Sequence, residues 1–189
     1  MKRIVIVHGV GKHTGGETAI KIFETVLRVK TGAECVFYEW DHPGRPPVDP
    51  RQQWLFSYAH PWVQEVLMDA AWAARCYELG QFPDLPEGNM YVGHSAGGIL
   101  VSGRPEPRVF MGCPIQLLKN MSMMVDINSL ANILNIVHKW DMIGAPIDFG
   151  VNKYTTEPYL GFLIRAHTGY WTSSQVIAAV VRHYDTYVR

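Results

Sequence analysis

Short apolar runs recur along the chain, and the intervals between them leave room for helices. Most runs are rich in β-branched residues and bounded by Gly, Pro or Asp, which is typical of strands buried on both faces of a sheet. They cover residues 4–7, 35–40, 90–92, 109–111, 133–137 and 160–164. We interpret them as the strands of a largely parallel sheet.

Segments of helical character separate these runs. They cover residues 17–29, 61–79, 95–101, part of 116–130, and 173–187. The alternation of strand and helix predicts one α/β domain over residues 1–189, with about six mostly parallel strands and helices on both faces. Ligands of such sheets bind at the carboxyl ends of the strands, so the polar residues that follow each apolar run are the candidates for chemistry.

Composition narrows the class of function. The chain has 17 basic and 17 acidic residues, so no net field attracts nucleic acid. The first apolar run is too short for a signal peptide or a membrane span, which predicts a cytoplasmic protein without an integral membrane segment. Cys35, Cys76 and Cys113 are widely spaced and form no CxxC pair, so neither a disulfide framework nor a thiolate metal site is indicated.

One motif carries chemistry in the structural context that it requires. The apolar run 90–92 is followed by Gly93-His94-Ser95-Ala96-Gly97 and then by an apolar helix start. This is a GxSxG motif between a strand and a helix, where a sharp turn exposes the serine hydroxyl above the sheet. The sequence therefore predicts Ser95 as a nucleophile and the Ala96 amide as a donor to an oxyanion.

With this motif the chain resembles the α/β-hydrolase superfamily, and most of all its compact lipases and esterases without a cap domain. His8-Gly9-Val10-Gly11 follows the first apolar run and is similar to the HGxG motif of that family. The resemblance implies a minimal α/β-hydrolase fold and a second oxyanion donor at the amide of Val10.

The family places its base in a loop after the last strand, in the chain order Ser, acid, His. Three histidines follow Ser95. His138 ends an apolar run, and His183 is expected on a solvated face of the last helix. His167 lies in the loop before that helix. The resemblance therefore implies His167 as the general base.

The acid of the family follows the penultimate strand of this region. Asp141 lies just past the apolar run 133–137 and matches this position. Asp148, seven residues on, is the competitor, and Asp126 precedes the run. We expect Asp141 to orient His167 and to stabilise its imidazolium without taking the proton.

Two other kinds of site are disfavoured. Gly11-Lys12 invites comparison with a phosphate-binding loop, but His13 follows where Ser or Thr is needed and Ile6 stands where the first Gly belongs. The histidines of the first half match no HxxxH or HExxH spacing. We predict no metal and no cofactor.

These residues predict a serine hydrolase that cleaves an ester through an acyl-enzyme. Apolar residues near the expected site suggest a small-molecule or lipid-like acyl ester; they are Trp62, Met142, Ile143 and Trp171. The same triad would serve a thioester or an amide, and a binding protein could keep the fold without turnover. Acyl-chain length and oligomeric state are not encoded in these patterns.

Overall fold

A computed structural model describes most of the chain. The described residues are 1–9, 17–38, 61–116, 132–141, 143–148, 150–155, 167 and 169–189, with the side chains of 17, 61–68 and 70 left out. Of the predicted segments, 160–164 and 117–130 lie outside these ranges, as do Val10, Met142 and Asp126.

Within the described residues, six strands form one sheet in the order β2-β1-β3-β4-β5-β6, and every neighbouring pair is parallel. The strands are β1 (Arg3–Val7), β2 (Glu34–Tyr38), β3 (Met90–His94), β4 (Arg108–Met111), β5 (Ile133–His138) and β6 (Val151–Thr155). This confirms the predicted α/β architecture. The prediction did not include β6, which lies at the edge of the sheet and exposes Val151 and Tyr154.

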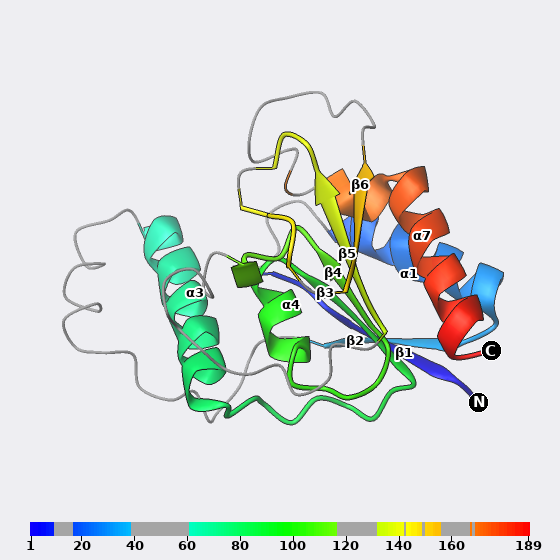
Figure 1. The fold of residues 1–189 in the computed structure, drawn as a ribbon, viewed down its shortest axis with the longest axis horizontal. Helices are drawn as coiled ribbons and strands as arrows, with labels where there is room; N and C mark the ends of the chain where they lie inside the picture. The colour runs from blue at the N-terminus through cyan, green and yellow to red at the C-terminus, as the bar shows by residue number, and fades with distance from the viewer. Residues whose placement is uncertain are drawn as a thin grey trace.

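Helices cover both faces of the sheet (Figure 1). The helices α1 (Glu17–Thr31) and α7 (Ser174–Tyr187) lie on one face, and α3 (Pro61–Leu79) and α4 (Ala96–Val101) lie on the other. Their bounds agree closely with the predicted segments. The start of α7 is fixed by Ser173, whose hydroxyl accepts a hydrogen bond from the amide of Val176 at 3.1 Å.

The alternation of side chains along β1 divides the core into two layers. Ile4 and Ile6 belong to the cluster under α1 and α7, whereas Val5 and Val7 belong to the cluster under α3 and α4. Both sets are fully buried. A strand with apolar partners on both faces has to be a continuous apolar run, which is why its sequence predicted it.

None of the helices in the described ranges is long and apolar enough to cross a membrane.

The turn from β3 into α4 depends on glycine. A Cβ at residue 93 would lie 2.5 Å from the Cα of Gly98 and 2.6 Å from the carbonyl oxygen of Gly97. Both atoms belong to the backbone of α4 and cannot move aside on their own. A larger residue at position 93 would therefore push the strand and the helix apart.

We expect Gly93→Ala to lower the free energy of unfolding by about 2 kcal/mol or more, because it overpacks the contact between β3 and α4. Gly32→Ala is the matched control, since a Cβ there meets nothing within 4 Å and only the left-handed backbone, with φ of 71°, opposes it. That strain costs about 1 kcal/mol. Urea denaturation would measure both, and a loss at Gly93 no larger than that at Gly32 would contradict this account.

Candidate active site

The predicted catalytic residues gather at the carboxyl ends of the strands. Ser95 follows β3, Asp141 follows β5, and His167 stands just before a short 3₁₀ helix, η1 (Gly169–Thr172). All three side chains are mostly buried. This edge of the sheet is the one where parallel α/β sheets bind their ligands.

Ser95 occupies a strained turn between β3 and α4. Its φ of 54° and ψ of −129° lie where residues with a side chain are rarely found. The turn is held from both sides: the amide of Ser95 donates to the carbonyl of Met111 at 2.9 Å, and its carbonyl accepts from the amide of Gly98 at 3.0 Å. A sharp strand-to-helix turn that exposes a serine hydroxyl, as predicted from the GxSxG motif, has a strained backbone of this kind.

Gly9, two residues after the end of β1, lies so close to Ser95 that a side chain would not fit between them. A Cβ at residue 9 would lie 2.7 Å from the Cβ of Ser95 and 3.2 Å from its Oγ. Gly9 of the predicted HGxG motif is therefore adjacent to the predicted GxSxG turn. Val10, the donor that the resemblance implies, lies outside the described residues.

His167 and Asp141 form a buried pair. The Nδ1 of His167 lies 3.0 Å from Oδ2 and 3.1 Å from Oδ1 of Asp141, whose side chain is fully buried. At this distance the protonated Nδ1 of the ring donates a hydrogen bond to the carboxylate. This bond fixes the orientation of the imidazole and leaves Nε2 for other partners. The structure thus brings together the two residues that the sequence predicted as base and acid.

Asp141 is held as a carboxylate. Burial acts to raise its pKa, but the hydrogen bond and charge of His167 outweigh burial, together with donors from Tyr170 and the amide of Ile143. Those two donors lie 2.7 Å from Oδ2 and 2.9 Å from Oδ1. The net result lowers the pKa of Asp141 to about 2.

Tyr170 is a part of this site that the sequence analysis missed. Its side chain is fully buried, and its hydroxyl donates to Asp141 while accepting from the amide of His138 at 2.8 Å. It therefore ties the carboxylate to the end of β5. The sequence offered one indication of this role: Tyr170 lies only three residues after the predicted base, His167.

His94 joins the serine turn to the histidine. Its Nε2–H donates to the main-chain carbonyl of His167 at 2.6 Å, and the two rings lie 4.9 Å apart. Burial, followed by the charge of His167, lowers the pKa of His94 to about 3, although the hydrogen bond to His167 and the charge of Asp141 act to raise it. The ring is therefore neutral at pH 7. The residue directly before Ser95 thus contacts the residue predicted as its base.

A Cβ at residue 112 would collide with the same network. It would lie 2.6 Å from Oδ2 of Asp141 and 2.8 Å from the Tyr170 ring. Gly112 also has a φ of 58°, which a residue with a side chain rarely adopts. Glycine after β4 is therefore a requirement of the carboxylate site.

The other predicted site residues lie in varied surroundings. Ala96 is the first residue of α4 and is buried, and Ile143 is 45% exposed beside Asp141. Trp171 is buried and packs against Phe23 and His94. Trp62 lies on α3, but its side chain is not described.

The competing candidates lie elsewhere. The expectation that His183 is solvated was wrong: it is 8% exposed, and its Nε2 lies 3.0 Å from the carbonyl oxygen of Asn132, because that face of α7 packs against the start of β5. His138 is also buried, with its Nδ1 accepting from the Trp140 amide. Asp148 is exposed.

Within the described ranges, no group of three or more His, Cys, Asp or Glu residues is arranged to hold a metal ion.

Comparisons with known proteins give similarity of structure alone. No protein-family model and no curated protein matches the sequence. An esterase domain of a Rhodothermus marinus protein superposes with a TM-score of 0.51 at 12% identity, covering 100% of this chain and 88% of that one. Carboxyl esterase 2 of the mycorrhizal fungus Tuber melanosporum gives a TM-score of 0.44 at 17% identity, covering 98% of this chain and 77% of the other. The first similarity supports the α/β fold.

The neutral state of His94 predicts a dependence of stability on pH. Its pKa is lowered from 6.5 to about 3, so between these values the unfolded chain binds a proton that the folded protein does not. The contribution of neutral His94 to the free energy of unfolding is therefore complete above pH 6.5, and it is lost as the pH falls toward 3.

We expect His94→Gln, which keeps a side-chain amide donor, to flatten this part of the stability curve by at most about 1.4 kcal/mol per pH unit. Urea denaturation of both proteins between pH 7 and pH 3 would measure it. Parallel curves for the wild type and the variant would contradict a buried neutral His94.

Proposed function

We propose that this protein is a serine hydrolase that cleaves a carboxylic ester. The observation that carries the proposal is the buried His167–Asp141 pair, joined through His94 to the strained turn that holds Ser95. A serine needs a base to become nucleophilic, and the base needs a carboxylate to hold its tautomer. Ser95 follows β3 and Asp141 follows β5, so both residues stand at the carboxyl ends of the strands, where parallel α/β sheets bind their ligands.

Each residue has one role in the proposed reaction. The Oγ of Ser95 attacks the ester carbonyl carbon, and its proton passes to Nε2 of His167. Asp141 accepts the hydrogen bond from Nδ1–H and stabilises the imidazolium. A carboxyl group with a pKa of about 2 remains charged throughout neutral pH, as this role requires.

The proposed reaction is completed in two halves. The carbonyl oxygen becomes an oxyanion, which accepts from the amide of Ala96 and, by the resemblance, from that of Val10. The alcohol leaves with the proton from His167 and an acyl-Ser95 remains. Water then attacks this ester, His167 takes its proton and returns it to Ser95, and a carboxylic acid is released.

Two observations support an uncharged acyl ester as substrate. Trp140 and Ile143 lie on either side of Asp141 in the chain and are 61% and 45% exposed, which places apolar surface near the site. The structurally similar Rhodothermus marinus chain is an esterase domain, which agrees with an ester as the bond cleaved.

We expect Ser95→Ala and His167→Gln each to lower kcat/KM for nitrophenyl esters by about 10³-fold or more, because each removes a member of a unit that acts together. Ser174→Ala is the matched control, since this serine is exposed at the start of α7 and has no role in the proposed reaction. Circular dichroism would show that each variant is folded. A series of esters from acetate to laurate, with a matching thioester, would then define the acyl chain and the bond.

Ester hydrolysis that survives in folded Ser95→Ala would refute the proposed nucleophile. Absence of hydrolysis in the folded wild type, on esters and thioesters alike, would favour a binding protein that keeps this fold.

A further inference from the structure

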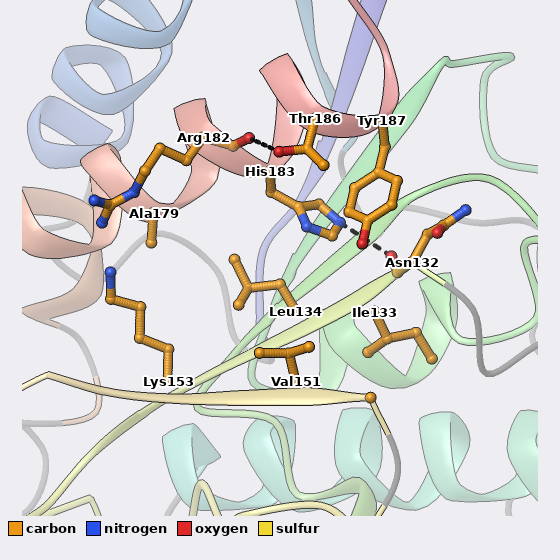
Figure 2. A pocket seen from close by; sticks show the side chains of 11 residues that line it. Asn132, Ile133, Leu134, Val151, Lys153, Ala179, Arg182, His183, Thr186 and Tyr187 are labelled. Carbon is orange, nitrogen blue, oxygen red and sulfur yellow. Dashed lines mark hydrogen bonds between the residues drawn. The ribbon is translucent and has the colours of Figure 1, made fainter.

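A pocket lies at the amino ends of strands β5 and β6, whereas Ser95 and Asp141 stand at the carboxyl ends of the strands. It opens between α7 and the first residues of β5 and β6, has a volume of about 320 Å³, and is shown in Figure 2. Because all six strands are parallel, the carboxyl ends that carry Ser95 and Asp141 are separated from this pocket by the length of the sheet. The pocket therefore has no part in the proposed ester hydrolysis.

The side of the pocket formed by the sheet is apolar. Leu134 of β5 and Val151 of β6 line it from below α7, and Ala179 lines it from the helix (Figure 2). Val151 is 61% exposed, although Leu134 and Ala179 beside it in the pocket are buried. A hydrocarbon group placed here would cover this exposed apolar surface.

Two cationic side chains reach the same end of the pocket from opposite sides. Arg182 comes from α7 and Lys153 from β6, and their charged groups approach each other in Figure 2. Neither forms an ion pair with any residue in the described part of the chain. Burial and then the charge of Arg182 lower the pKa of Lys153, as expected for two cations that face each other without an anion between them.

Two other polar side chains of the pocket, His183 and Thr186, are already paired. The Nε2–H of His183 donates to the carbonyl of Asn132, and the hydroxyl of Thr186 donates to the carbonyl of Arg182 at 2.8 Å. Burial lowers the pKa of His183, which keeps its ring uncharged at pH 7. No carboxylate is among the described residues that line the pocket, so its charge is that of the two cations.

We propose that this pocket binds a small amphiphilic anion, a carboxylate or phosphate monoester attached to a hydrocarbon group. The anionic group lies between Arg182 and Lys153, where it offsets their mutual repulsion and accepts charge-assisted hydrogen bonds. The hydrocarbon lies over Leu134 and Val151. A volume near 300 Å³ is at the small end of ligand pockets and suits a short chain.

The test uses the full chain, with hexanoate and hexyl phosphate as probes and hexanol, acetate and inorganic phosphate as controls. We expect both amphiphilic anions to shift the amide NMR signals of residues 132–134, 150–153 and 179–187. The double variant Lys153→Met with Arg182→Gln keeps the side-chain stems but removes both charges, and we expect it to weaken binding about tenfold or more. Lys21→Met on α1, which removes a lysine outside the pocket, should leave binding unchanged.

The relative affinity of the two probes would show whether a carboxylate or a phosphate is preferred. Shifts that persist in the double variant, hexanol binding as tightly as hexanoate, or shifts confined to the residues around Ser95 would each overturn the proposal. Ester hydrolysis should be unchanged in the double variant, since the pocket contains no residue of the proposed catalytic site. Anion binding at this pocket and ester hydrolysis at Ser95 are therefore tested independently.

Discussion

The geometry around Ser95 depends on the close approach of β3 to α4. Gly93 lies against Gly98 with no room for a side chain, and this contact forces the chain to reverse direction within one residue. Ser95 is that residue, and its left-handed backbone costs about 1–3 kcal/mol, which the surrounding hydrogen bonds and the fully buried α4 offset. A strained serine at a rigid turn is thereby fixed in place before any substrate arrives.

The rest of the site is assembled around this turn by buried polar contacts. His94 links the turn to the main chain of His167, and Asp141 holds the ring of His167 from the other side. Tyr170 connects Asp141 to the end of β5. Each buried polar group in this chain of contacts has a partner, which is the condition under which a polar network strengthens a core instead of weakening it. The proposed catalysis follows from such preorganisation.

The sequence predicted what local patterns determine. Four strands, β1, β3, β4 and β5, were recognised because burial on both faces makes each one a largely apolar run. The edge strand β2 is only partly buried, but its residues 35–38 are still apolar. The other edge strand, β6, exposes Val151 and Tyr154 and shows no such run. Ser95 was recognised because its turn is encoded within five residues. The roles of Tyr170 and His94 depend on contacts across 29 and 73 residues, and the burial of His183 depends on how α7 packs, so neither could be predicted from the sequence alone.

The central claim is that Ser95 is an activated nucleophile. Labelling of the purified wild type with a fluorophosphonate, followed by mass spectrometry of its peptides, tests this most directly, because such a probe reacts with serines that a neighbouring base activates. The account predicts one adduct, on Ser95, that disappears in Ser95→Ala. A folded wild type that takes no label, or a label that persists in Ser95→Ala, would contradict it.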